Sequence, residues 1–366
     1  MSRLLSLLSL ILFLPAVAPS QDAPAGEKAK AVAGRPTILV VVGAEGAEEY
    51  GEKFRAAAAE WKAAAEVGEA TYLEIGLDPK ATDDQAQLEA RLGELAADQT
   101  AGPLWLILIG HGTFDGRVAK FNVRGPDFSD TDLAGWLKPF SRPLAVVNAA
   151  SASGSFIKTL AAPKRVVITA TKTASEVFYA RFGEYFAQAI GGREEADLDN
   201  DDQVSLLEAF LFSADQVAAF YEKDGRLATE HALLDDTGDG FGTRPDAFEG
   251  IRATMVAKEG ADPDGEFAHQ FVLVPNAVER RLTAAQRERR DELERQVKSL
   301  VRKRQELGDD TYYARIEPLL VEIARIYDTV KDPEPKPGTD AKPAEPKKET
   351  PPPPASAPAA KDGKSS

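Results

Sequence analysis

Residues 106–112 read Leu106-Ile107-Leu108-Ile109-Gly110-His111-Gly112, and residues 146–155 read Val146-Val147-Asn148-Ala149-Ala150-Ser151-Ala152-Ser153-Gly154-Ser155. Each stretch starts as an apolar run, typical of a strand buried on both faces, and ends in small or polar residues. Neighbouring parallel strands of an open α/β sheet end at the same edge. We therefore expect His111 and Ser151 to lie together in a crevice at that edge.

Apolar runs elsewhere in the chain alternate with segments of helical periodicity. This alternation predicts an α/β fold with a doubly wound, mostly parallel sheet flanked by helices. The expected helices cover 47–66, 178–190, 206–221 and a segment that begins with the capping box Thr82-Asp83-Asp84-Gln85 and ends near Ala97. The expected strands cover 37–42, 70–75, 104–109, 144–147, 166–170 and, late in the chain, 271–274.

Composition narrows the possible chemistry. None of the 366 residues is cysteine, which excludes a disulfide framework, a thiolate metal site and a thiol nucleophile. The formal net charge of -15 argues against nonspecific binding to nucleic acid, so we expect no nucleic-acid partner.

The N-terminus predicts export. Arg3, an apolar run over 4–18 and small residues up to Ser20 form the pattern of a signal peptide over 1–20. A flexible leader over 21–34 would follow. We expect a periplasmic or extracellular protein with no stable membrane span after cleavage, and an uncleaved anchor is the alternative.

The two strand ends resemble those of the legumain and caspase clan of cysteine peptidases. In that clan one apolar strand ends in His-Gly, and the next ends in a small residue followed by the nucleophilic cysteine. The resemblance covers about 37–190 and places Ser151 where the cysteine would stand. It implies a caspase-like sheet in which His111 protonates the leaving amine, the backbone N–H of Gly112 holds the oxyanion and Ser151 is the nucleophile.

The change from cysteine to serine predicts a noncatalytic domain. A serine hydroxyl needs an adjacent base, and the histidine of the clan does not pair tightly with the nucleophile. Three alternatives stay open: an active serine peptidase, a register shifted to Ser153 or Ser155, and a strand that His111 merely terminates. Asp115 could orient His111 only if its loop folds back. Ala149 replaces the acid of the legumain pattern, so a pocket that reads asparagine is not expected.

Residues 197–208 match the calcium loop of an EF-hand. Ca²⁺ binds about seven hard oxygens, so acids and amides at fixed spacing are the expected ligands. Asp202 occupies the sixth position, usually glycine, and Asp tolerates the left-handed backbone needed there. The alternative is a solvated acidic turn. The expected ligands are Asp197, Asp199, Asp201, the backbone carbonyl of Gln203, Ser205 through water, and Glu208.

A second acidic loop, residues 234–241, lacks full EF-hand spacing. We interpret it as an ordinary turn, with a further cation site or the rim of the crevice as alternatives. His231 and His269 show no metal-binding spacing, and we assign them no function.

The C-terminal part changes character. Apolar stripes over 283–307 and beyond Gly308 predict a helical hairpin, either a packing appendage or a partner-binding coiled coil. The Pro- and Lys-rich segment 331–366 predicts a disordered tail. We thus expect an α/β domain over 35–278, the hairpin over 279–330 and the tail.

These features favour an exported pseudopeptidase that binds a peptide or protein partner and calcium. The alternatives are an active peptidase that uses Ser151 and His111, and a calcium-stabilised scaffold. The oligomeric state does not follow from the sequence.

Overall fold

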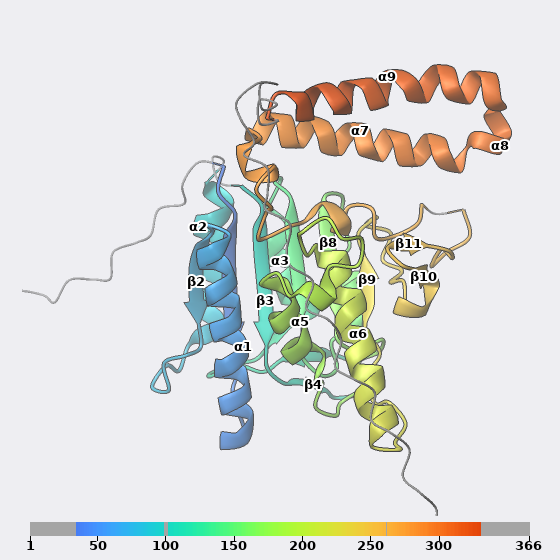
Figure 1. Ribbon diagram of the computed structural model, residues 1–366. Helices are drawn as coiled ribbons and strands as arrows, with labels where there is room; N and C mark the ends of the chain where they lie inside the picture. Colours follow the sequence, from blue (N-terminus) through green and yellow to red (C-terminus); the bar gives the residue numbers. More distant parts are fainter. Residues whose placement is uncertain (1–33, 99–101, 261, 331–366) are drawn as a thin grey trace, which may run out of the picture.

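The computed structural model describes residues 34–98, 102–260 and 262–330. A six-stranded sheet in the order β2-β1-β3-β7-β8-β9 forms its centre (Figure 1). All neighbouring pairs are parallel except β8 with β9, which is antiparallel. The strands are β1 (Thr37–Val42), β2 (Thr71–Ile75), β3 (Leu104–Ile109), β7 (Leu144–Asn148), β8 (Arg165–Thr169) and β9 (Leu233–Asp235).

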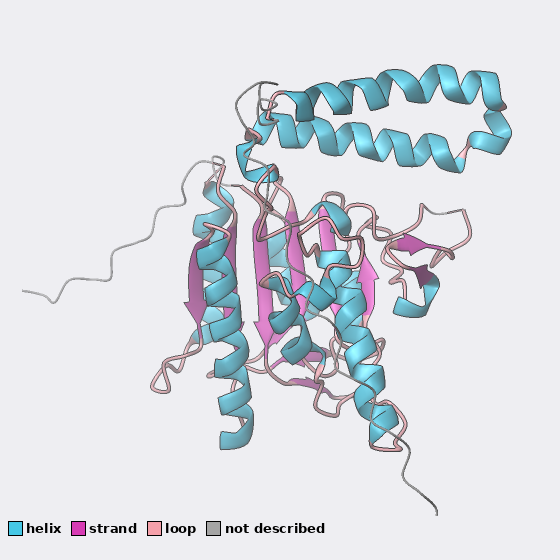
Figure 2. Ribbon diagram, viewed as in Figure 1, coloured by secondary structure: helices cyan, strands magenta, loops and turns pink. Residues whose placement is uncertain are grey.

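Helices cover both faces of this sheet (Figure 2), which is why the central strands are apolar at consecutive positions. Alternate residues enter two separate cores, as Val40 and Val41 of β1 illustrate. One core holds α1 (Glu48–Val67), α5 (Phe182–Ile190) and α6 (Leu206–Lys223), and the other holds α2 (Asp84–Ala97), α3 (Asp130–Leu137) and α4 (Ser155–Leu160). The predicted α/β architecture with a mostly parallel sheet is confirmed.

Short antiparallel elements extend this architecture. Strands β4 (Gly112–Phe114), β5 (Ala119–Phe121) and β6 (Phe128–Ser129) form a small sheet that starts immediately after His111. Strands β10 (Phe248–Glu249) and β11 (Arg252–Ala253) pair in a hairpin. At two or three residues each, they are too short for a periodicity argument to detect.

The predicted helical hairpin is present. It consists of α7 (Ala284–Arg302), the short α8 (Arg304–Leu307) and α9 (Asp309–Asp328). Figure 1 shows it across one end of the sheet, and a cavity of about 1490 Å³ separates α7 from the amino ends of the strands. Arg280 ties the segment before α7 to the end of α1, since its guanidinium donates to the carbonyl of Val67 at 3.0 Å.

Three predicted local features are wrong. No capping box forms at Thr82: α2 starts at Asp84, and the carboxylate of its N-cap residue, Asp83, accepts from the Gln87 side chain instead of a backbone N–H. The helix expected over 178–190 starts at Phe182, because Glu230 binds the backbone N–H groups there. Residues 271–274 form no strand and contribute a single bridge between Val272 and Ser205.

Within the described residues, no helix combines the length and apolarity needed to cross a membrane. The expected signal peptide, leader and tail lie outside the described residues, apart from Gly34.

Candidate functional site

The two quoted strand ends meet at the carboxyl edge of the sheet. Leu108 of β3 pairs with Asn148 of β7 in parallel register, so both chains leave the sheet at the same level. Gly112 and Ser151 then approach within hydrogen-bonding distance. A Cβ atom on Gly112 would lie 2.1 Å from the carbonyl oxygen of Ser151, so only glycine permits this approach.

The Ser151 hydroxyl both accepts a hydrogen bond from Gly112 and donates one to it. The N–H of Gly112 donates to Ser151 Oγ at 3.1 Å, and the hydroxyl donates to the carbonyl of Gly112 at 3.1 Å. The side chain is buried, with 3% of Ser151 exposed. The donor expected to hold an oxyanion is therefore already occupied, and the expected nucleophile has no free proton to give a base.

His111 lies at the same edge, partly buried against three aromatic rings. Its ring centroid is 4.7 Å from that of Tyr50, 5.2 Å from that of Phe54 and 6.0 Å from that of Tyr179. Burial lowers the pKa of His111, and a hydrogen bond to the backbone of Glu45 opposes this shift only partly. Among the described residues, no hydrogen bond joins the His111 ring to Ser151. His111 is thus a neutral, packed imidazole near neutral pH.

Of the two alternative serines, Ser153 is fixed by hydrogen bonds in the turn after β7, whereas the buried Ser155 hydroxyl, at the start of α4, has no partner among the described residues. The hydroxyl of Ser153, a residue that is 1% exposed, bonds to Thr171 Oγ1 at 3.1 Å, and Gly154 N–H donates to the same oxygen at 3.0 Å. Ala152 adopts a left-handed backbone with φ 54 and donates its N–H to the carbonyl of Glu176 at 2.7 Å. Such a conformation costs energy in a residue other than glycine and marks a tightly constrained turn.

Asp115 does not orient His111. Its carboxylate accepts the backbone N–H groups of Arg117 and Val118, each at 2.8 Å, within its own turn. These bonds lower the pKa of Asp115 and leave the carboxylate facing solvent.

The sequence interpretation missed one ionisable pair at this edge. His231 Nδ1 lies 2.6 Å from a carboxylate oxygen of Glu176, the residue whose carbonyl binds Ala152. The two residues come from different loops, so no local spacing could have revealed them. A cavity of about 10 Å³ borders Gly110 and Tyr179, which is room for about one water molecule and not for a substrate side chain.

The acidic loop 197–208 lies at the opposite end of the molecule, at the start of α6. Carboxylate oxygens of Asp197, Asp199 and Asp201 lie within 4.8 Å of one another. The carboxylate of Asp197 accepts the N–H groups of Asp201 at 3.1 Å and Asp202 at 2.9 Å. Asp202 has φ 63, the left-handed backbone that the sixth position requires.

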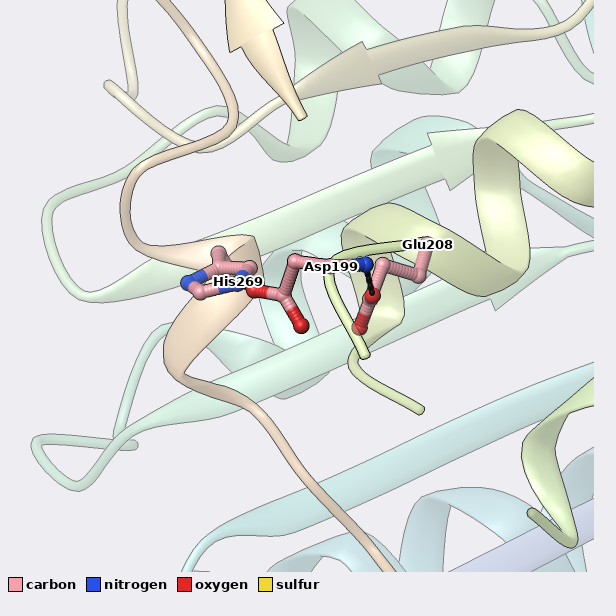
Figure 3. A group of neighbouring side chains, drawn as sticks. All are labelled: Asp199, Glu208 and His269. Atoms are coloured by element: carbon pink, nitrogen blue, oxygen red, sulfur yellow. Dashed lines mark hydrogen bonds and ion pairs between the residues drawn. The ribbon is translucent and has the colours of Figure 1, made fainter. Parts of the chain in front are cut away.

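Glu208 and Ser205, two of the expected ligands, also hydrogen-bond to each other at the start of α6. They form the capping box of α6, with the Ser205 hydroxyl donating to Glu208 at 2.8 Å. One possible ligand atom from each of Glu208, Asp199 and His269 lies within 4.8 Å of the other two (Figure 3). Within this group, His269 Nε2 lies 3.0 Å from the Asp199 carboxylate. The Gln203 side chain donates to Asp201 at 2.8 Å. The loop therefore presents two overlapping acid groups that share Asp199.

The carboxylates in this loop repel one another. Burial raises the pKa of Asp201, and the neighbouring Asp199 and Asp197 raise it further. Burial also raises the pKa of Glu208, against the hydrogen bonds from Ser205. The donor set is mainly hard carboxylate oxygen, which fits Ca²⁺ or Mg²⁺, and His269 is its one softer member.

No family model matches the chain, and no curated protein matches it. Three solved structures with similarity to the chain follow. The crystal structure of the Drosophila initiator caspase Dronc has a TM-score of 0.39 and 12% identity, covering 64% of this chain and 95% of that chain. For drICE the TM-score is 0.35 and the identity 9%, with coverage of 52% and 85%. For caspase-1 from Spodoptera frugiperda the TM-score is 0.34 and the identity 8%, covering 58% of this chain and 91% of that chain.

At such TM-scores and identities these structures establish neither a family nor an activity for this chain.

Proposed function

We propose that this chain is an exported, noncatalytic peptidase-like protein that recognises a peptide or protein partner and binds calcium. One observation carries the noncatalytic part. The Ser151 hydroxyl is buried, accepts a hydrogen bond from the N–H of Gly112 and donates one to its carbonyl. The His111 ring is packed against aromatic rings. Serine catalysis needs a hydroxyl within reach of a base, and this arrangement provides neither the free hydroxyl nor the contact.

The loop that follows β8 supports partner recognition. Val177 is 49% exposed and Phe178 is 66% exposed, next to Glu176, which holds the turn after β7. Neighbouring apolar side chains left in water at the carboxyl edge of a sheet form a small surface on which an extended peptide can dock.

A peptide library tests both parts with the full secreted chain. We expect no cleavage by the wild type, with or without Ca²⁺, and capture of a subset of peptides that is lost in Phe178→Ser. Phe241→Ser is the matched control, because Phe241 is 48% exposed on a different loop. Cleavage that disappears in both Ser151→Ala and His111→Ala would contradict the proposal and favour an active serine peptidase. Equal capture by both phenylalanine variants would reject the docking surface.

Calcium would have a structural role in this proposal. The acidic loop is bonded to the segment that leads into the hairpin: Asn276 Nδ2 donates to the carbonyl of Asp201 at 2.9 Å, and Asn276 N–H donates to Gln203 Oε1 at 3.1 Å. A cation among Asp197, Asp199 and Asp201 would neutralise their repulsion and stiffen this connection.

Calorimetric titration with Ca²⁺ tests the loop. We expect saturable binding in the wild type, and at least about tenfold weaker binding in Glu208→Gln, because a hard cation loses a charged ligand. Glu89→Gln makes the same change on the exposed side of α2 and should bind as the wild type does. No heat of binding at millimolar Ca²⁺ would reject the site and leave a solvated acidic turn.

A further inference from the structure

The second acidic loop contains buried aspartates that have no positively charged side chain as a partner among the described residues. Asp235 and Asp236 on this loop are 0% and 7% exposed, and Asp264 from a later segment is 3% exposed. Over the described part of the chain, none of the three forms a salt bridge. Buried carboxylates without a cation are costly, so the surrounding groups must compensate the charge or remove it.

The carboxylates of Asp236 and Asp264 each bind backbone N–H groups of the segment that carries the other. The Asp236 carboxylate accepts the N–H groups of Gly265 at 3.0 Å, Phe267 at 2.8 Å and Ala268 at 2.7 Å. The Asp264 carboxylate accepts the N–H group of Asp236 at 3.1 Å and the hydroxyl of Thr243 at 2.5 Å. The two side chains thus join the loop 235–243 to the segment 262–268 from both directions.

The N–H of Asp236 donates to the Asp264 carboxylate, and the N–H of Gly265, the residue after Asp264, donates to the Asp236 carboxylate, so the two carboxyl groups belong to one buried cluster. Two ionised carboxylates in such a cluster repel each other, and protonation of one of them removes the repulsion. Burial raises the pKa of Asp264 to about 8, and the adjacent Asp236 contributes to the shift. Burial also raises the pKa of Asp236.

The charged surroundings do not replace this proton. Asp235 and Asp239 on the same loop are acidic. Glu266, on the facing segment, is attracted to Arg302 and Lys298 of α7, and Arg302 is paired with Glu266 and Asp262. The nearby cations therefore interact with Glu266 and Asp262, and the buried pair keeps only neutral donors.

We propose that Asp236 and Asp264 share one proton near neutral pH, and that this proton latches the segment 262–268 onto the loop 235–243. Loss of the proton leaves two adjacent buried anions, which repel each other and open the segment. The segment leads directly to His269, which contacts Asp199, and to Val272, which bridges Ser205. Opening would therefore loosen the flank of the acidic loop and the connection to the hairpin.

Linkage gives the expected pH dependence. In the closed state the buried pair keeps its proton up to the raised pKa of Asp264. In the open state the solvated aspartates lose that proton at the ordinary aspartate pKa. The opening constant thus rises about tenfold per pH unit between roughly pH 5 and pH 8, and levels off above the raised pKa. Stability from the latch is complete at low pH and disappears as pH rises through about 8.

Hydrogen exchange of the backbone over 262–272, corrected for intrinsic rates and measured on the full chain in EDTA, tests the latch. We expect the tenfold rise per unit in the wild type and a response flat to within about twofold in Asp264→Asn, whose neutral amide has no proton to release over this pH range. Asp262→Asn, with an exposed side chain, is the matched control and should retain the wild-type slope.

A second variant keeps the latch testable if Asp264→Asn does not fold. Asp236→Asn then replaces it, since it removes the other titratable carboxyl group of the pair. A flat wild-type response, or equal slopes in the wild type and the folded variant, would overturn the shared proton. Loss of the wild-type slope on adding Ca²⁺ would also overturn it, because a cation would then bridge the pair.

Discussion

At the scale of single residues, Ser151 illustrates how contacts decide the role of a polar side chain at a strand end. Its hydroxyl fits between strand ends that bring Gly112 and Ser151 into contact, and it bonds to both backbone groups of Gly112. A residue buried in this way stabilises the crossing of the two chains. Its contacts are thus those of a structural residue.

Ser151→Ala should therefore destabilise the fold. The substitution leaves the N–H and carbonyl of Gly112 unpaired and buried, which costs about 1 to 3 kcal/mol. Urea unfolding followed by circular dichroism measures this loss. Ser155→Ala is the control, because Ser155 Oγ is buried without a partner among the described residues and its loss should cost under about 0.5 kcal/mol. Equal stability of the two variants would contradict the structural role of Ser151.

At the scale of elements, the hairpin depends on few buried side chains. Leu293 of α7 is fully buried, whereas Tyr312 and Ile316 of α9 keep 8% and 7% of their surface exposed. Arg290 links the hairpin to the preceding segment through Glu279 and bonds to the Tyr327 hydroxyl at 2.8 Å. Leu293 is thus the residue on which the packing of the two helices depends most.

Leu293→Ala should destabilise the hairpin by about 2 to 5 kcal/mol, because it removes buried methyl groups and leaves a cavity. Hydrogen exchange should become faster throughout α7 and α9 and stay unchanged in β1, β3 and β7. Leu320→Ala, at a position that is 47% exposed, should change exchange little. Faster exchange in the central strands would show that the hairpin and the sheet unfold together.

At the scale of the whole molecule, the two candidate sites lie at opposite ends of the sheet. His111 and Ser151 follow the carboxyl ends of β3 and β7. The acidic loop lies at the start of α6, next to the segment that leads to the hairpin at the amino edge (Figure 1). Calcium bound to this loop cannot contact His111 or Ser151. Its direct effect is confined to the hairpin end.

Calcium should accordingly protect only one end of the chain. At about a hundred times the dissociation constant, binding contributes about 2.7 kcal/mol, enough for about a hundredfold slower local exchange. We expect this slowing over 197–208 and 269–282, and no change over 110–123. Hydrogen exchange with and without Ca²⁺ measures both regions at once. Slowing at 110–123 alone would place the cation elsewhere.

Much of the fold follows from local sequence. The strands β1 and β3 have the predicted bounds, because a run buried on both faces is apolar at every position. The start of α5 could not be predicted, because it depends on Glu230, which binds the N–H groups of Arg181 and Phe182 from 49 and 48 residues away. The capping box at Thr82 failed because side-chain bonds nearby compete with the backbone.

The sequence by itself determined the parallel α/β sheet, the hairpin, the absence of thiol chemistry and the meeting of the His111 and Ser151 strand ends. These depend on periodicity and residue type, which are local properties. Only the tertiary structure decided that Ser151 bonds to Gly112, that aromatic rings pack against His111 and that Asp236 and Asp264 are buried in one cluster. These depend on contacts between residues distant in sequence, and such contacts decide whether a buried polar group is paired, charged or free to react.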